Sequence, residues 1–171
     1  MTLPRSPDRE RLPEDRFRRI FEAHYPAVFG YAARRVGADA AGDVAAESFT
    51  VAWRKLGEVP GEPDTLPWLL GVARRVVANE HRSRRRRERL AVTVAAHSRS
   101  GVRSEPDGGI LEAFGRLPLR DREVLRLAAW EGLDPRGLAV VLGCSPNAAA
   151  VRLHRARRRL DDAVSELGGE R

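Results

Sequence analysis

The chain has 171 residues, of which 42% are hydrophobic and 32% charged, and its formal net charge is +7 at pH 7. This length allows one domain or two small ones, and the positive charge indicates a polyanionic partner. The single cysteine, Cys144, excludes an internal disulfide and a cysteine-based zinc cluster, and no apolar run approaches membrane-spanning length. The expectation is a soluble, cytoplasmic protein without metal or cofactor.

The N-terminal part of the chain predicts a tail followed by helices. Residues 1–12 are polar and broken by prolines, which indicates a disordered tail without the apolar core of a signal peptide. From 13 to 89 apolar residues recur at helical spacing, and no strand-type alternation competes with them. Three helices are expected: one that ends near Gly37, one over about 39–56, and one from about Thr65 to 89. The segment 57–64, with two prolines and two glycines, predicts a loop.

The C-terminal part predicts a second helical domain. Residues 90–109, with their serines and glycines, indicate a flexible linker, and residues 110–167 a domain with helices over 110–116 and 119–131 and a further pair. In that pair, Asp134-Pro135 and Ser145-Pro146 are helix starts, because the first residue can cap the helix and proline suits the first helical position. Gly143 supplies the tight turn between them. The predicted fold class is all-α: two small helical domains joined by a flexible linker, the C-terminal one a helix-turn-helix.

The last helix of this pair has the pattern of a DNA-reading helix. Ala149, Leu153, Ala156 and Leu160 recur at spacings of three and four and predict an inward stripe. A recognition helix meets base edges and phosphates with its other side, and arginine suits both. The residues expected to contact DNA are Asn147, Val151, Arg152, His154, Arg155 and Arg158. The alternative for this basic run is a solvated face without a partner.

The third helix of the N-terminal domain combines an apolar and a basic side. Trp68, Val72 and Val76 are expected to pack inward. The residues expected to lie along a nucleic acid backbone are Arg74, Arg75, Asn79, Arg82, Arg85 and Arg86. A basic RNA-binding tail is the alternative, but it does not explain the apolar helix that leads into the arginines.

Five short motifs, in this order and spacing, resemble the two conserved domains of an extracytoplasmic-function (ECF) sigma factor of the sigma-70 superfamily. They are residues 43–54, 68–79, 117–125, 142–145 and 152–157. The resemblance implies a non-enzymatic protein that binds core RNA polymerase, at its β′ clamp and β flap, and directs it to promoter DNA. It implies that the domain 13–89 binds the clamp and the minus-10 element, and that the domain 110–167 binds the minus-35 element. Members of the family are commonly held by an anti-sigma factor.

The resemblance also assigns the acidic and aromatic second helix to polymerase binding, through Asp43, Glu47 and Trp53. Aromatic side chains flanked by charge favour a protein interface, but Phe49 is expected to be a core residue. Two departures from the family pattern bear on DNA reading. Ala148 and Ala150 stand where the family commonly has a hydroxyl and a lysine. Gly137 replaces a glutamate and should destabilise its helix by up to about 1 kcal/mol relative to alanine.

Two other function classes are open to the same residues. A conventional helix-turn-helix regulator would bind operator DNA without polymerase, but it would need a ligand-binding or dimerisation element, and none is evident. An enzyme acting on nucleic acid would need clustered carboxylates or a nucleophile beside a base. The four scattered histidines of the chain do not provide such a cluster.

Overall fold

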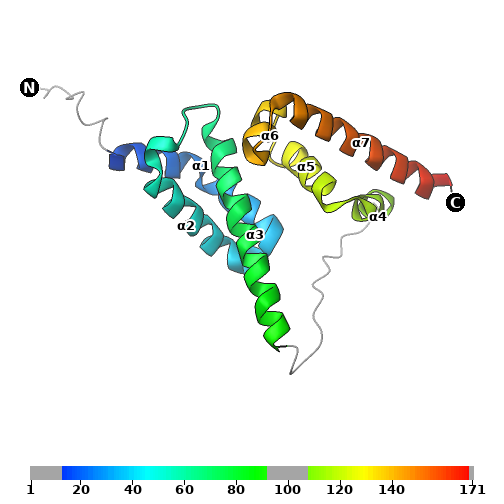
Figure 1. The fold of residues 1–171 in the computed structure, drawn as a ribbon, viewed down its shortest axis with the longest axis horizontal. Helices are drawn as coiled ribbons and strands as arrows, with labels where there is room; N and C mark the ends of the chain where they lie inside the picture. Colours follow the sequence, from blue (N-terminus) through cyan, green and yellow to red (C-terminus); the bar gives the residue numbers. More distant parts are fainter. Residues whose placement is uncertain (1–12, 92–107, 170–171) are drawn as a thin grey trace, which may run out of the picture. The chain divides into compact units, whose positions relative to one another are not determined.

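The computed structural model describes residues 13–91 and 108–169, which are helical apart from short connections (Figure 1). The chain divides after Ser83 into two compact units. The first holds α1 (Pro13–Val36), α2 (Ala38–Arg54) and most of α3 (Thr65–Ala91), and the second holds α4 (Gly108–Arg116), α5 (Leu119–Ala129), α6 (Pro135–Leu142) and α7 (Pro146–Gly169). The predicted all-α fold class is confirmed. None of the helices within the described ranges combines the length and apolarity needed to cross a membrane.

The predicted tail, residues 1–12, lies outside the described residues, as do residues 92–107 of the predicted linker. At both ends of that linker the structure is helical, because α3 continues to Ala91 and α4 begins at Gly108. The domain boundaries at 89–90 and 109–110 therefore fall inside these helices.

In the first unit, α1 and α2 form an antiparallel pair joined by Gly37. This residue has a φ of 87°, a conformation that glycine adopts at no steric cost. The predicted end of the first helix near Gly37 and the predicted start of the third at Thr65 are confirmed. The segment between α2 and α3 begins with a short 3₁₀ turn, η2 (Leu56–Glu58). The core takes large or apolar side chains from all three helices, among them Val28, Tyr31, Val44, Phe49, Leu69 and Leu70.

Aromatic rings of α1 and α2 pack against one another in a row. Four rings of α1 follow one another at every fourth position, which places them on one face of the helix. The first three meet the two aromatic residues of α2, with Phe21 and Phe49 4.8 Å apart and Phe17 and Trp53 5.2 Å apart between ring centroids. Phe49 is 2% exposed and thus a core residue, as expected, whereas Trp53 ends the row with 43% of its surface exposed.

In the second unit, local capping marks the starts of α6 and α7 and the ends of α5 and α6. Oδ1 of Asp134 accepts a hydrogen bond from the N–H of Gly137 at 2.8 Å, and Oγ of Ser145 accepts one from Ala148 at 3.2 Å. Gly143 is left-handed, with a φ of 64°, as the predicted turn requires. The helix expected over 119–131 ends at residue 129 because Gly132 also adopts a positive φ, and the N–H of Leu133 then bonds back to the carbonyl of Leu127.

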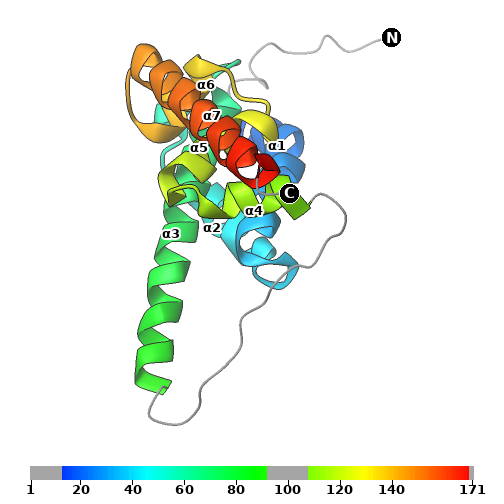
Figure 2. The same cartoon turned by 90° about the vertical axis from the view of Figure 1, so that its right-hand side faces the viewer.

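Helix α7 lies against α4, α5 and α6 in both views (Figure 1 and Figure 2). The predicted inward stripe is confirmed, since Ala149 and Ala156 are fully buried, Leu153 is 6% exposed and Leu160 is half-buried. This packing leaves the opposite side of α7 open to solvent.

Candidate nucleic-acid interface

The open side of α7 gathers most of the residues predicted to contact DNA. Since successive residues of an α-helix are about 100° apart, residues spaced by three and four share a face. Asn147, Val151, His154, Arg155 and Arg158 follow this spacing, all are exposed, and they lie opposite the buried stripe. Arg152 is exposed as well, but it leaves the helix on a flank of this face. We refer to the set of five as the outward face of α7.

The basic run at the end of this face has an internal partner that the sequence analysis did not predict. Arg159 pairs with Asp121 of α5, a carboxylate that is only 7% exposed. Arg157 and Arg158 are exposed. Of these three consecutive arginines, Arg159 is therefore the one paired with a carboxylate of α5, 38 residues away in the sequence.

Helix α3 carries a second basic stripe. Arg75, Asn79, Arg82 and Arg86 are separated by four, three and four residues, so they lie on one exposed side of the helix. Nε of Arg75 donates to the carbonyl of Gly71 at 3.1 Å, and Arg82 donates to the side-chain oxygen of Asn79. Val72 and Val76 are inward as predicted, at 4% and 6% exposed, and they border this stripe, whereas the opposite side is formed by residues such as Leu70 and Val77, at 0% and 6% exposed.

Two predicted residues of α3 lie apart from this stripe. Arg74 is exposed, but it is one position from Arg75 and therefore points to another side of the helix. Arg85 belongs to α3, and its side chain lies outside the described part of the chain.

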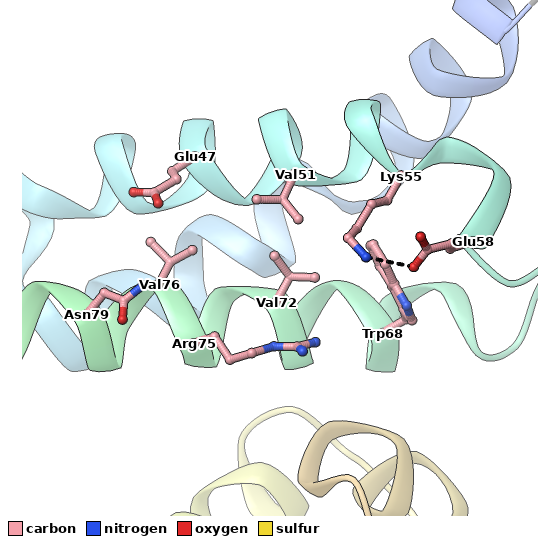
Figure 3. Close-up of a pocket in the computed structure, with 9 residues that line it drawn as sticks. All are labelled: Glu47, Val51, Lys55, Glu58, Trp68, Val72, Arg75, Val76 and Asn79. Carbon is pink, nitrogen blue, oxygen red and sulfur yellow. Dashed lines mark hydrogen bonds and ion pairs between the residues drawn. The ribbon is translucent and has the colours of Figure 1, made fainter.

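A groove of about 350 Å³ runs between α2 and α3 (Figure 3). Its middle is apolar, from Val51, Val72 and Val76. Its lining is completed by Glu47 and Asn79 at one end, by Lys55, Glu58 and Trp68 at the other, and by Arg75 between them. Nζ of Lys55 lies 2.8 Å from Oε2 of Glu58, at the end where Trp68 lies. Two carboxylates and two cations offset each other in this lining, which suits a polar but uncharged group better than a phosphate.

The groove brings together residues that the sequence analysis had assigned to different partners. Glu47 was predicted to bind polymerase, while Arg75 and Asn79 were predicted to bind DNA. Val51, Lys55 and Glu58 were not predicted at all. The matching signal in the sequence is the four-residue spacing of 47, 51 and 55, which places these positions on the side of α2 that continues into η2.

The three residues predicted to bind polymerase divide between two sides of α2. Asp43 and Glu47 are exposed and four residues apart, so they share a face. Trp53 leaves the helix toward α1, where its ring packs edge-on against Phe17. Thr50 is exposed between these two sides, and Arg54 is exposed on the same face as Asp43 and Glu47.

The second unit also exposes an apolar face that the sequence analysis missed. Leu119 in α5 and Trp130, the residue after its end, are 73% and 54% exposed, and Ile110 and Leu111 of α4 are 53% and 56% exposed. The guanidinium of Arg126 lies 5.5 Å from the ring centre of Trp130 and also stacks over the ring of Phe114 in α4, at 5.2 Å. Exposed apolar side chains around an arginine are typical of a protein interface. We call this the apolar face of α4 and α5.

Within the described ranges, no group of three or more histidine, cysteine or acidic residues is arranged to hold a metal ion. The described residues also form two basic surfaces. A helix-turn-helix presents an arginine-bearing face, and a separate helical unit presents a basic stripe beside a groove. These features are typical of a DNA-binding protein.

Comparisons with known proteins identify the family. Residues 20–87 match the family described as Sigma-70 region 2, and residues 108–160 match Sigma-70, region 4. The chain is 30% identical to the RNA polymerase sigma factor CarQ of Myxococcus xanthus, over 90% of this chain and 92% of CarQ. It is also 30% identical to the ECF RNA polymerase sigma factor SigL of Mycobacterium tuberculosis, over 88% of this chain and 90% of SigL. The chain therefore belongs to the sigma-70 family of RNA polymerase sigma factors, in its ECF group.

Other similarities concern part of a relative or the fold. The chain is 33% identical to the probable sigma factor RfaY of Xanthomonas campestris over 67% of its length, but this spans only 32% of RfaY. The sigma factor RpoE of Bartonella quintana, solved with the anti-sigma factor NepR, superposes with a TM-score of 0.62 at 22% identity, over 87% of this chain and 96% of RpoE. CnrH, solved with the cytosolic domain of CnrY, gives a TM-score of 0.59 at 24% identity, over 88% of each chain. These two structures support the fold.

The family decides between the function classes that the sequence left open. A sigma factor acts with core polymerase at promoters, so the conventional regulator is not favoured. Sigma factors as a family are not enzymes.

Proposed function

We propose that this chain directs core RNA polymerase to promoters by reading duplex DNA with α7 and by holding the opened strand along α3. The outward face of α7 carries the proposal. Its five residues are exposed on one side of a helix whose other side is buried. A helix of this kind, placed after a helix-turn-helix turn, fits the major groove. In promoter terms this is the minus-35 element.

Within α7 the position of each residue suggests its contact. His154 and Arg155 lie midway along the length of the outward face, on its two edges, and arginine can bind guanine through two hydrogen bonds. Arg152, on the flank, and Arg158, one turn further along, suit phosphates. Asn147 and Val151 lie near the N-terminus of the helix, the part that enters the groove first.

The basic stripe of α3 suits a phosphate backbone, and the adjacent groove suits a base of the minus-10 element. An unpaired base needs a surface on which to stack and polar groups for its edge. Trp68 and the valines of the groove provide the first, and Asn79 provides the second. The offset charges of the lining agree with this assignment, since a base is polar but uncharged.

The exposed side of α2 and the apolar face of α4 and α5 are the surfaces we assign to polymerase. Asp43, Glu47 and Trp53 would bind the β′ clamp, and Leu119 and Trp130 would bind the β flap. The two surfaces belong to different units, so one chain holds the enzyme at two places. Nucleotidyl transfer stays with the polymerase, and the chain acts beside it in the cytoplasm without catalysis of its own.

An anti-sigma factor is a further proposed partner. RpoE was solved in complex with the anti-sigma factor NepR, and it shares the fold of this chain. The same surfaces that hold polymerase would be the ones to cover if such a partner is to prevent polymerase binding.

Transcription in vitro tests the proposal. Core polymerase is supplied with a library of promoter fragments, with and without the full chain, and start sites are mapped. The expected result is a set of chain-dependent starts that share two sequence elements. Arg155→Ala should redistribute these starts, whereas Arg120→Ala, an exposed arginine on α5, serves as the matched control and should not. DNA binding by the chain alone, without new starts in the presence of polymerase, would favour the conventional regulator instead.

A further inference from the structure

Asp121, in the first turn of α5, is the one charged residue among the buried side chains of the described ranges. A buried carboxylate is costly unless hydrogen bonds or an opposite charge compensate it. The N-terminus of α5 compensates part of this charge, because the unpaired N–H groups of a first helical turn favour an anion. The rest comes from α7, where Nη1 of Arg159 donates to Oδ2 of Asp121.

Arg159 belongs to the basic run of α7, yet its guanidinium is directed at another helix of the same unit. The side chains of Arg159 and Asp121 are 46% and 9% exposed. With 3.6 residues per turn, Arg159 leaves α7 between the outward face and the buried stripe. From this flank it can reach α5, and the carboxylate there offsets its positive charge.

The other contacts of α7 allow the ion pair a role in fixing the rotation of this helix about its own axis. Two residues of the buried stripe, Ala149 and Ala156, have side chains of a single carbon and interlock little with the neighbouring helices. Rotating a helix by about 10° moves a side-chain tip about 5 Å from its axis by roughly 1 Å. A shift of that size weakens a hydrogen bond to a base edge, because such bonds tolerate only small changes in distance and angle.

We infer that the ion pair between Asp121 and Arg159 sets the rotation of α7 about its own axis, and thereby aligns the outward face with the base edges. Both are positioning residues for promoter reading, and Arg159 is not a phosphate contact. This inference rests on the proposed function, because it requires α7 to read duplex DNA.

The test compares holoenzymes assembled from core polymerase and the full chain. The chain is wild type or carries Asp121→Asn, Arg159→Ala, Arg159→Lys or Arg158→Ala. Two quantities are measured on duplex promoter fragments. One is the ratio of dissociation constants between the preferred upstream element and its single-base variants, and the other is the slope of log K against log salt. Thermal unfolding of each free chain establishes that it is folded at the assay temperature.

Asp121→Asn and Arg159→Ala should both lower the discrimination ratio by about tenfold, the size of one good base contact, and leave the salt slope unchanged. Arg159→Lys keeps the charge but loses the planar fork, so it should lower the ratio in the same direction by less. Arg158→Ala is the matched control on the outward face, and it should reduce the salt slope by about 1 while the ratio is kept. A role in stability alone would weaken binding to all fragments alike, so the ratio separates positioning from folding.

Two results would overturn the inference alone. In the first, Arg159→Ala reduces the salt slope by about 1 and keeps the ratio, which would make Arg159 a phosphate contact. In the second, the wild-type chain discriminates between upstream elements and Asp121→Asn discriminates equally well. A wild-type holoenzyme that shows no preference for any upstream element would have a different meaning, because it would overturn the proposed function and this inference with it.

Discussion

Arg152 and Arg155 are three residues apart on α7, so their directions from the helix axis differ by about 60°. Arg155 lies within the outward face, and Arg152 lies on its flank. Because base edges lie at the centre of the major groove and phosphates along its rims, the two arginines should have different roles.

Arg155→Ala should therefore cost about 1–3 kcal/mol of discrimination between promoter variants, as expected for the loss of a base contact. Arg152→Ala should instead weaken binding to all variants alike and reduce the salt slope by about 1. Titrations of several minus-35 variants at a series of salt concentrations separate these effects. The assignment would be wrong if the two substitutions exchanged their effects, or if neither had one.

At the residue scale, the sequence predicts which side of α7 faces outward but not what every arginine touches. The outward face follows from the apolar residues at spacings of three and four, which fix the buried side. The partner of Arg159 does not follow, because Asp121 is distant in the sequence and its burial depends on how α5 packs against α7. Similarly, the separation of Trp53 from Asp43 and Glu47 depends on the ring of Phe17 in α1.

At the scale of elements, the segment between α2 and α3 is held in place by α1. Nη1 and Nη2 of Arg16 donate to the carbonyls of Leu56 and Val59, at 2.7 and 2.5 Å. Nε2 of His24 lies 2.8 Å from Oε1 of Glu62 in the same segment. These contacts matter for the groove, because Lys55 and Glu58 form one of its ends.

Arg16→Ala should destabilise the first unit by about 2 kcal/mol, because hydrogen bonds from a charged donor contribute about 1.5–3 kcal/mol each and water can reach part of this site. Hydrogen exchange should quicken at the amides of Glu58 and Val59, whose bonds to Lys55 and Leu56 form the 3₁₀ turn. Arg19→Ala, an exposed neighbour on the same helix, is the control and should change stability by less than about 0.5 kcal/mol. Unchanged exchange rates at these two amides in Arg16→Ala would show that the segment keeps its conformation without the hydrogen bonds from Arg16.

Gly137 in α6 has a tighter environment than its sequence suggests. Helix propensity predicts a gain of up to about 1 kcal/mol for Gly137→Ala. In the structure, however, an added Cβ would lie 3.2 Å from Cδ2 of Leu133 and 3.4 Å from Oδ1 of Asp134, the atom that caps the helix. Crowding should offset the gain, and we expect a net change within about 0.5 kcal/mol.

The free energy of unfolding of Gly137→Ala, measured in urea beside that of a control variant, tests this expectation. The control is Gly115→Ala in α4, where an added Cβ meets nothing within 4 Å, and it should show more of the propensity gain. An increase of about 1 kcal/mol in the free energy of unfolding of Gly137→Ala would mean that the side chain of Leu133 moves aside without an energetic cost.

The sequence predicted where α6 and α7 begin, but it did not predict the groove between α2 and α3. Asp134 and Ser145 act on residues three positions away, so their capping can be read locally. The groove needs the side of α2 that bears Val51 to meet the side of α3 that bears Val72, with η2 between them. This arrangement depends on packing across the unit, which a single helical pattern does not determine.

At the scale of the whole molecule, the chain consists of two compact units, each with its own proposed DNA contact. Asn79 belongs to the first unit and Arg155 to the second. Changes at sites that share no neighbours have additive effects on free energy, usually to within about 0.5 kcal/mol.

The effects of Asn79→Ala and Arg155→Ala on promoter binding by holoenzyme should therefore add. A double-mutant cycle on one promoter, with dissociation constants for wild type, both single variants and the double variant, measures the coupling. A coupling energy well above about 0.5 kcal/mol would show that one element is engaged only when the other is.

The order of the two units could be predicted from helical periodicity and from the five motifs that resemble ECF sigma factors, and the matches to regions 2 and 4 confirm it. The apolar face of α4 and α5 could not be predicted in the same way. Leu119 and Trp130 are apolar, so their sequence pattern alone would bury them, and only the packing of α5 shows that both are exposed.

The rim of the groove holds a residue type that the chain uses only once. Lys55 is its single lysine, and its ammonium group pairs with Glu58 at one end of the groove. An acylating reagent directed at amines therefore has a single side-chain target in the protein. The side chain of Lys55 is 51% exposed. Acylation would remove the charge that holds Glu58, and a DNA strand lying in the groove would shield the amine. The rate of labelling at this position is thus a direct footprint of groove occupancy, without any engineered probe.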